Sequence, residues 1–133
     1  MAKAMIYVAK PTLSLVPVNG LVPLGGIVRR FGCCIALSGN TVTLKDSGYY
    51  KVSVSATVAP VADGDVTLTL TDNGTAVVGA TASALTAAAG QEVSMSIDAV
   101  VRVICPCDRG NLALEITGEE SNIVNVAMVV EKL

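Results

Sequence analysis

Apolar and polar residues alternate along most of this chain, and this period of two constrains the fold more than any other feature. In Tyr49–Val58, every second residue from Tyr50 onward is Tyr, Val or Ala, and the residues between are Lys, Ser or Thr. Successive side chains of a β-strand point to opposite faces, so the pattern predicts a strand with one buried face. The same alternation predicts strands at Val66–Thr71, Val93–Val103 and Leu112–Thr117.

Shorter runs of the same kind complete the pattern. Turn-forming residues separate them, as in Asp72-Asn73-Gly74, where Asn and Gly supply the positive φ of a tight hairpin. The alanine-rich Thr81–Ala89 locally prefers helix, but Leu85 is its only large apolar residue and leaves a helix no face to pack. We expect a poor strand or a loop there, with a helical turn as the alternative. Eight to ten strands in one domain predict an all-β protein, an antiparallel β-sandwich or barrel. The shorter candidates are Met5–Ala9, Leu13–Val18, Gly26–Arg30, Cys33–Leu37, Thr41–Leu44 and Thr75–Ala80.

The composition excludes several classes of function. With 9 basic and 11 acidic residues among 133, the chain has no basic surface for nucleic acid. No apolar run reaches the ~18 residues of a membrane helix. Histidine, the usual general base and metal ligand, is absent, and no glycine cluster has phosphate-loop spacing. Asp63 and Asp65 could offer oxygens to Ca²⁺, but two acids make a weak site. We therefore expect neither an enzyme nor a cofactor or metal site.

The last segment, Asn122–Leu133, is apolar on both faces. Val126 and Met128 would lie on one face and Ala127 and Val129 on the other. A single sandwich covers only one face of a strand, so the second face needs another cover, and a neighbouring subunit is the simplest one. The charged fraction of 15%, against about 25% in an ordinary soluble domain, also suggests covered surface. The predicted subunit interface consists of Ile123, Asn125, Ala127 and Val129.

Four cysteines form two close pairs, Cys33-Cys34 and Cys105-Pro106-Cys107. Adjacent cysteines rarely bridge each other because the geometry is strained, so a disulfide would join one pair to the other. Four thiols could also hold Zn²⁺, although neither pair has the two-residue spacing of a zinc knuckle. Free thiols packed as small apolar residues, a disulfide between the pairs, a bridge between chains and a zinc site therefore all stay open.

Several motifs occur in an order that resembles the tumour-necrosis-factor-like and complement-type globular-head superfamily. The resemblance covers Val22–Leu133 and is closest to the bacterial and phage branch, including C-terminal domains of collagen-like spore-surface glycoproteins. The motifs are Val22-Pro23-Leu24, Phe31-Gly32-Cys33-Cys34-Ile35, Gly48-Tyr49-Tyr50-Lys51-Val52, Leu70–Gly79 and Ala127–Leu133. The resemblance implies a jelly roll of eight to ten strands that forms a homotrimer, with the C-terminal strand near the threefold axis.

The resemblance also implies a role. No Gly-x-y repeat is present, which favours phage head decorations, fibres and tail tips over heads on collagen-like stalks. We expect a jelly-roll domain at 21–133 and an N-terminal strand or tether at Met1–Gly20 that docks on other virion proteins. The N-terminus lacks the apolar stretch of a secretory signal, so synthesis in the host cytoplasm and incorporation into the virion are expected.

Two functions of different classes are therefore predicted. The first is a structural virion protein, a trimeric decoration or fibre head that could also aid adhesion. The second is a module of a phage tail tip or bacterial surface that binds a receptor or glycan through loops such as Val61–Asp65 and Thr81–Gly90. Few aromatic residues are available for stacking on sugars, which favours the first function.

Overall fold

Eleven strands and no helix make up the part of the chain that the computed structural model describes, residues 4–11, 13–17, 20–32, 35–86, 88, 90–104, 110–118 and 120–133. Accordingly, no helix among these residues could span a membrane. The first six strands are β1 (Met5–Lys10), β2 (Ser14–Val16), β3 (Gly26–Phe31), β4 (Ile35–Ser38), β5 (Thr41–Leu44) and β6 (Gly48–Pro60). The other five are β7 (Gly64–Asp72), β8 (Thr75–Thr86), β9 (Val93–Val103), β10 (Gly110–Gly118) and β11 (Ser121–Lys132).

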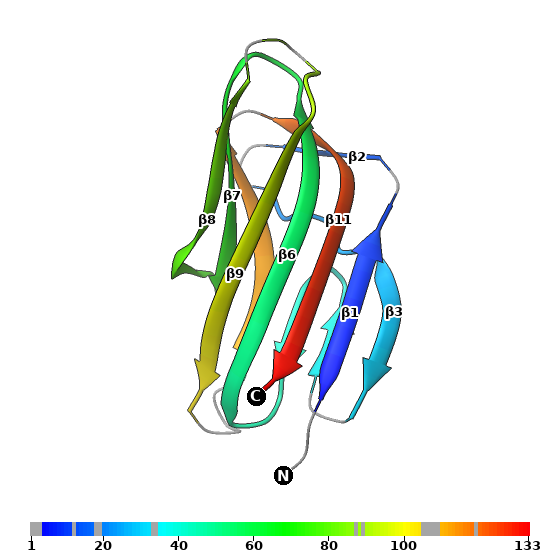
Figure 1. Ribbon diagram of the computed structural model, residues 1–133, viewed down its shortest axis with the longest axis vertical. Coiled ribbons are helices and arrows are strands. Elements are labelled where there is room, and N and C mark those ends of the chain that lie inside the picture. The colour runs from blue at the N-terminus through cyan, green and yellow to red at the C-terminus, as the bar shows by residue number, and fades with distance from the viewer. Residues whose placement is uncertain are drawn as a thin grey trace.

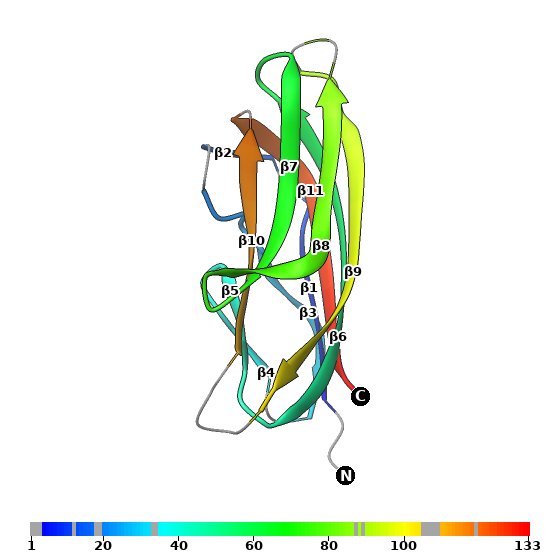
Figure 2. The ribbon, with the colours of Figure 1, turned by 90° about the vertical axis from the view of Figure 1, so that its left-hand side faces the viewer.

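The strands form two antiparallel sheets packed face to face (Figures 1 and 2). The larger sheet has the order β3-β1-β11-β6-β9, with β2 paired to the start of β11, and the smaller sheet has the order β4-β5-β10-β7-β8. This arrangement confirms the predicted antiparallel sandwich. The strand count exceeds the expected eight to ten because strands form in all of the short candidate runs.

The core lies between the sheets and consists of the alternating apolar side chains that the period of two selects. Its branched aliphatic residues are joined by Tyr50, which is fully buried and donates a hydrogen bond from its hydroxyl to the Asp46 carbonyl oxygen at 2.7 Å. A buried tyrosine needs such a partner for its hydroxyl. Lys132 closes the same end of the sandwich with an ion pair from its Nζ to Asp46 Oδ2 at 2.9 Å.

The first six residues of the alanine-rich segment are in a strand rather than a loop or a helical turn. Thr81–Thr86 continues β8 and pairs with β7, with Ser83 opposite Thr67 and Leu85 opposite Asp65. Ala80 and Thr86 are buried in this strand, whereas Leu85 is exposed. Pairing along a nine-residue neighbour therefore outweighs the local helix preference of alanine.

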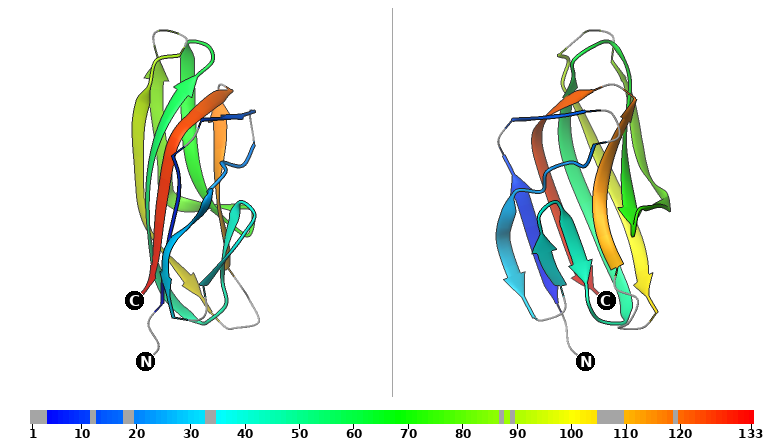
Figure 3. Two further views of the ribbon diagram at one scale, coloured as in Figure 1. Left: turned by 90° about the vertical axis from the view of Figure 1, so that its right-hand side faces the viewer. Right: turned by 180° about the vertical axis from the view of Figure 1, so that it is seen from behind.

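The described residues of the N-terminal segment, 4–11 and 13–17, contribute two strands to the sandwich. They take the strand form of the predicted strand or tether, and docking on other virion proteins stays a prediction. β1 lies between β3 and β11 in the larger sheet, as the right-hand view of Figure 3 also shows. Ile6 and Val8 project from it into the core and have no exposed surface. The strand predicted at Met5–Ala9 therefore forms, with neighbours on both sides that satisfy its backbone.

Candidate interaction surface

The outward face of β11 is the region in which the sequence predicted a subunit interface. The structure divides the four predicted residues. Ala127 and Val129 lie on the outer face and are half-buried, and Asn125 lies there exposed. Ile123 is instead 0% exposed in the sandwich core, so the prediction that it faces outward is wrong. A β-bulge is the reason: Ile123 pairs with Val58 and Asn125 with Thr57, which leaves one extra residue between them and reverses the phase of the strand.

The apolar surface extends from β11 onto β1. Across the strands, Val129 lies opposite Tyr7 and Ala127 opposite Ala9, and all four side chains are half-buried on the same face. We call this surface the outer strip. It consists of Met5, Tyr7, Ala9, Ala127 and Val129. Aliphatic and aromatic groups are therefore gathered at the centre of the larger sheet, on the side away from the core.

The other half of this face is polar. On β6 and β9 the outward residues carry mainly hydroxyl groups, and Ser53 Oγ donates a hydrogen bond to Asp98 Oδ1 at 2.8 Å. Ser53 pairs with Val129 on one side and Asp98 on the other, so the polar half borders the outer strip directly. The outward hydroxyl residues are Ser53, Ser55, Thr57, Ser94 and Ser96.

Strand β3 provides a second apolar surface at the margin of the larger sheet. All six of its residues are exposed, including Ile27, Val28 and Phe31. Arg29 and Arg30 lie on the same strand and are exposed as well. An edge strand that is bare on both faces and carries two arginines is poorly suited to pair with further strands, but it can contact another surface through its side chains.

The remaining predicted sites contribute little. The residues Cys33, Cys34, Cys105 and Cys107 lie outside the described part of the chain, so the alternatives for their pairing stay predictions. Asp63 and Asp65 lie at the turn into β7, and Asp65 is exposed. Among the described residues, no three His, Cys, Asp or Glu side chains come together as metal ligands.

Two features of this surface and its surroundings were missed from the sequence. Met5, Tyr7 and Ala9 lie in the predicted short strand Met5–Ala9 but were not included in the predicted subunit interface, although their alternation with Ile6 and Val8 indicates an outer face. The sequence also presented Asp72 only as a turn residue. In the structure it lines a cleft of about 300 Å³ beside β9. Period-two analysis cannot find such a cleft because it depends on how far two strands separate.

No protein-family model matches the chain, and no curated protein matches it. Solved structures do match over nearly the whole length. Eiger TNF from S. frugiperda aligns with a TM-score of 0.70 at 13% identity, covering 98% of this chain and 91% of its own. The globular domain of zebrafish complement 1qA aligns with a TM-score of 0.70 at 12% identity, covering 97% and 95%. The PRD1 vertex protein P5 aligns with a TM-score of 0.65 at 13% identity, covering 98% and 96%. The chain therefore has the jelly-roll fold of the tumour-necrosis-factor-like and complement-type globular domains.

Proposed function

We propose that the chain is a structural protein of a phage particle, a homotrimeric jelly-roll head that decorates the particle or caps a fibre. The observation that carries the proposal is the outer strip, an apolar surface at the centre of the larger sheet that the protomer itself leaves uncovered. The fold shared with the PRD1 vertex protein P5 supports a place in a virion.

The position of the outer strip supports subunit association. A threefold axis passing beside β11 would bring three copies of the strip together and remove Tyr7, Ala127 and Val129 from water. The half-buried state of these side chains in the protomer means that each has surface left to bury. Obligate interfaces commonly bury more than ~2,000 Å² and resemble a domain core. The exposed apolar residues of β3 add to the surface that such an assembly could cover.

The first test concerns assembly. Ala127→Glu places a charge in the proposed interface, where an unpaired charge is strongly destabilising. Because Ala127 points away from the core, we expect folded monomers with unchanged circular dichroism. Light scattering should fall from about three times 13.5 kDa to 13.5 kDa.

Thr81→Glu is the matched control, because Thr81 is exposed on the outward side of the smaller sheet. It should keep the mass of the trimer. A wild-type protein that scatters as a 13.5 kDa monomer at micromolar concentration would contradict the proposed trimer.

The second test concerns the particle. Purified phage particles from cells that produce the wild-type chain should contain it by mass spectrometry, at a copy number that is a multiple of three. The Ala127→Glu chain should be absent from the particles and present in the lysate, whereas Thr81→Glu should be incorporated. Wild-type chain found only outside the particles would overturn the virion role while leaving the trimer intact.

A glycan-binding module is the second candidate, and one observation favours it. Tyr49 is 52% exposed, and the guanidinium carbon of Arg102 lies 5.4 Å from the centroid of its ring. An exposed aromatic ring next to a cationic donor is a suitable surface for a sugar. On a glycan array, specific binding that Tyr49→Ala abolishes would support this candidate, and an array without signal would exclude it for the glycans tested.

A further inference from the structure

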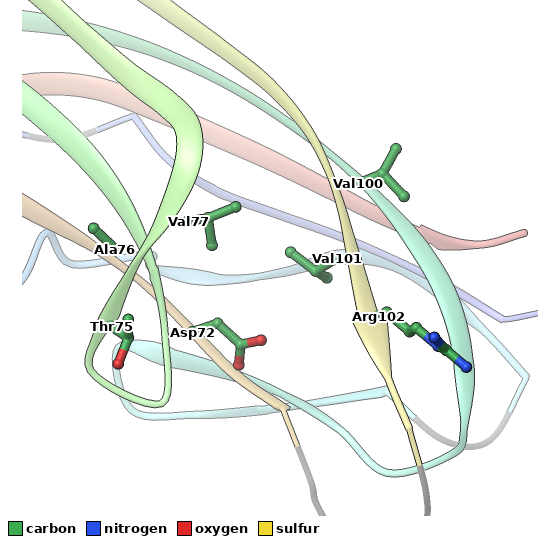
Figure 4. Close-up of a pocket in the computed structure, with 7 residues that line it drawn as sticks. All are labelled: Asp72, Thr75, Ala76, Val77, Val100, Val101 and Arg102. Carbon is green, nitrogen blue, oxygen red and sulfur yellow. The ribbon is translucent and has the colours of Figure 1, made fainter.

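A cleft opens where the two sheets separate, between the β7–β8 hairpin and the end of β9. Its volume is about 300 Å³, at the lower limit of pockets that hold small molecules. Figure 4 shows Asp72 and Val77 on the hairpin side, with Val101 and Arg102 on the β9 side. The described lining residues thus come from both sheets, and the cleft is part of the fold rather than of a loop.

The carboxylate of Asp72 has unused capacity to accept hydrogen bonds. The backbone N–H of Asn111 donates to this carboxylate, whereas Oδ1 is buried and has no partner among the described residues. An ionised carboxylate offers about four acceptor sites, so one donor leaves most of them unsatisfied. Rotation about the Cβ–Cγ bond, which is a broad torsion in aspartate, can turn either oxygen toward the cleft.

The one other charged residue among the described lining residues does not neutralise Asp72. Arg102 lies over the Tyr49 ring, and Figure 4 shows its guanidinium group directed away from the Asp72 carboxylate. Burial raises the pKa of Asp72 above its usual value of 3.8, and the hydrogen bond from Asn111 opposes that rise. A cation supplied from outside would offset the cost of keeping this charge partly out of water.

The chemical groups that line the cleft indicate which kind of cation it can bind. Side-chain oxygens among the described lining residues come only from Asp72 and Thr75, fewer than the six to eight oxygens that Ca²⁺ takes. Val77 and Val101 instead line the cleft with apolar side chains, whereas Figure 4 shows Val100 directed to the other side of β9. Such walls suit an aliphatic chain that ends in a hydrogen-bond donor.

We propose that this cleft binds an alkylammonium group, with the ammonium on the Asp72 carboxylate and its aliphatic chain between Val77 and Val101. The group could belong to a free amine or to a lysine side chain of a protein. Neither source requires the proposed trimer or the virion role, so this inference can fail or hold independently of both.

The test uses the full-length protein with n-butylammonium chloride as the probe and n-butanol as its uncharged counterpart. Methyl NMR signals of Val77 and Val101 should shift in a saturable manner with the amine and respond far more weakly to the alcohol. Asp72→Asn should weaken the binding by about tenfold or more, because hydrogen bonds to charged groups contribute ~1.5–3 kcal/mol. Asp65→Asn, an exposed acid at the other end of β7, should leave it unchanged.

Two further experiments distinguish a free amine from a lysine side chain as the ligand and provide a second variant in case Asp72→Asn misfolds. N-acetyl-lysine amide should bind if the source is a lysine side chain, and only n-butylammonium should bind if the source is a free amine. Ala76→Leu narrows the cleft from an exposed position on β8 and should block the probe without removing the carboxylate. Equal responses to amine and alcohol, or an amine response that neither Asp72→Asn nor Ala76→Leu reduces, would overturn the proposal, as would the absence of saturation.

Discussion

The two sheets bury similar residues toward the core but present different surfaces outward. On the larger sheet the centre of the outer face is the outer strip. On the smaller sheet the corresponding positions of β7, β8 and β10 are mostly threonine and serine, and Thr67 and Ser83 share a hydrogen bond between their hydroxyls at 3.0 Å. These outward residues are Asp65, Thr67, Thr69, Thr81, Ser83, Leu85, Glu115 and Thr117. Leu85 is the exception among them, a large apolar side chain that is 75% exposed.

The difference lies in how the two outer faces interact with water: the face of the smaller sheet is mainly hydrated hydroxyl groups, and the centre of the larger sheet exposes apolar groups. Hydroxyl groups can bond to water or to each other across neighbouring strands, so the smaller sheet gains little from a further cover. Methyl, thioether and phenol groups of the outer strip gain roughly 25 cal/mol for each Å² of apolar surface removed from water. Both faces serve the folding of the protomer. The larger sheet stands to gain more from association because its apolar side chains are adjacent in the outer strip, whereas Leu85 has polar residues as neighbours on the smaller sheet.

The largest expected change in stability comes from comparing substitutions on the two faces of β11. Met128 is fully buried and Val129 is its outward neighbour. Met128→Ala should lower the free energy of unfolding by about 2–5 kcal/mol, because it leaves a cavity in the core. Val129→Ala should change the stability of the protomer far less and instead weaken assembly. Urea unfolding at two protein concentrations measures both quantities, since only the assembly contribution depends on concentration. Equal losses for both variants would remove the distinction between the faces.

A substitution at the end of β10 tests whether the close approach of β10 to β7 contributes to the stability of the smaller sheet. Gly118 has a φ of +90°, and a Cβ there would overlap the backbone oxygen of Asp65. Gly118→Ala should therefore destabilise the chain by about 2–3 kcal/mol, through left-handed strain and displacement of β7.

Gly39→Ala is the matched control for this experiment. Gly39 also has a positive φ, +59°, but a Cβ there meets nothing within 4 Å. It should cost about 1 kcal/mol in thermal or urea unfolding. A Gly118→Ala chain as stable as the control would show that β7 and β10 can shift freely at this point.

A lesser change in stability is expected when the outer face of the five-stranded sheet is made apolar, like the centre of the larger sheet. Thr67→Val with Thr69→Val removes two hydroxyls from its outer face and leaves methyl groups in their place. The free energy of unfolding should change by no more than about 1 kcal/mol, because one exposed hydrogen bond is lost and strand propensity is retained. Sedimentation velocity should then report species heavier than the wild-type assembly. An unchanged sedimentation profile would mean that apolar outward side chains do not by themselves drive association here.

The smallest expected effect lies at the margin between the sheets and depends on pH. Because the pKa of folded Asp72 is raised, the folded chain holds this proton more tightly than the unfolded chain. The penalty is therefore absent below pH 3.8, grows as the pH rises toward the raised value, and is constant above it. Asp72→Asn should stabilise the protein slightly at neutral pH and not at pH 3. Asp65→Asn is the control, and a pH-independent effect of Asp72→Asn would contradict this assignment.

The period of two predicted most of this fold because strands with one buried face alternate Val with Thr or Ser, and that alternation is visible in the sequence. β6, β7, β9 and β10 lie where the alternation placed them, within a few residues. β8 extended further than predicted, since alanine carries little information about which face of a strand is buried. Pairing with β7 decides its conformation.

The candidate site was predicted less completely, and the reasons are physical. A bulge inserts one residue without a sequence signature, so Ile123 was assigned to the wrong face while Ala127 and Val129 were assigned to the right one. The strand β1 was predicted as the short run Met5–Ala9. Its contribution to the outer strip was missed because a six-residue strand near a terminus fits a docking segment equally well. The width of the cleft at Asp72 depends on the separation of strands from different sheets, which no local pattern records.

Both ends of the described chain lie at one pole of the sandwich. The backbone N–H of Lys132 donates to the Ala4 carbonyl oxygen at 2.9 Å, and Figure 1 shows the turn between β6 and β7 at the opposite pole. Val61 in that turn is exposed, and its N–H is bonded to the Glu120 carbonyl oxygen. The protomer is thus polarised in the manner of a display scaffold. A domain fused at either terminus would emerge on one side, and a peptide grafted into residues 61–63 would be carried on the other, roughly the full length of the strands away.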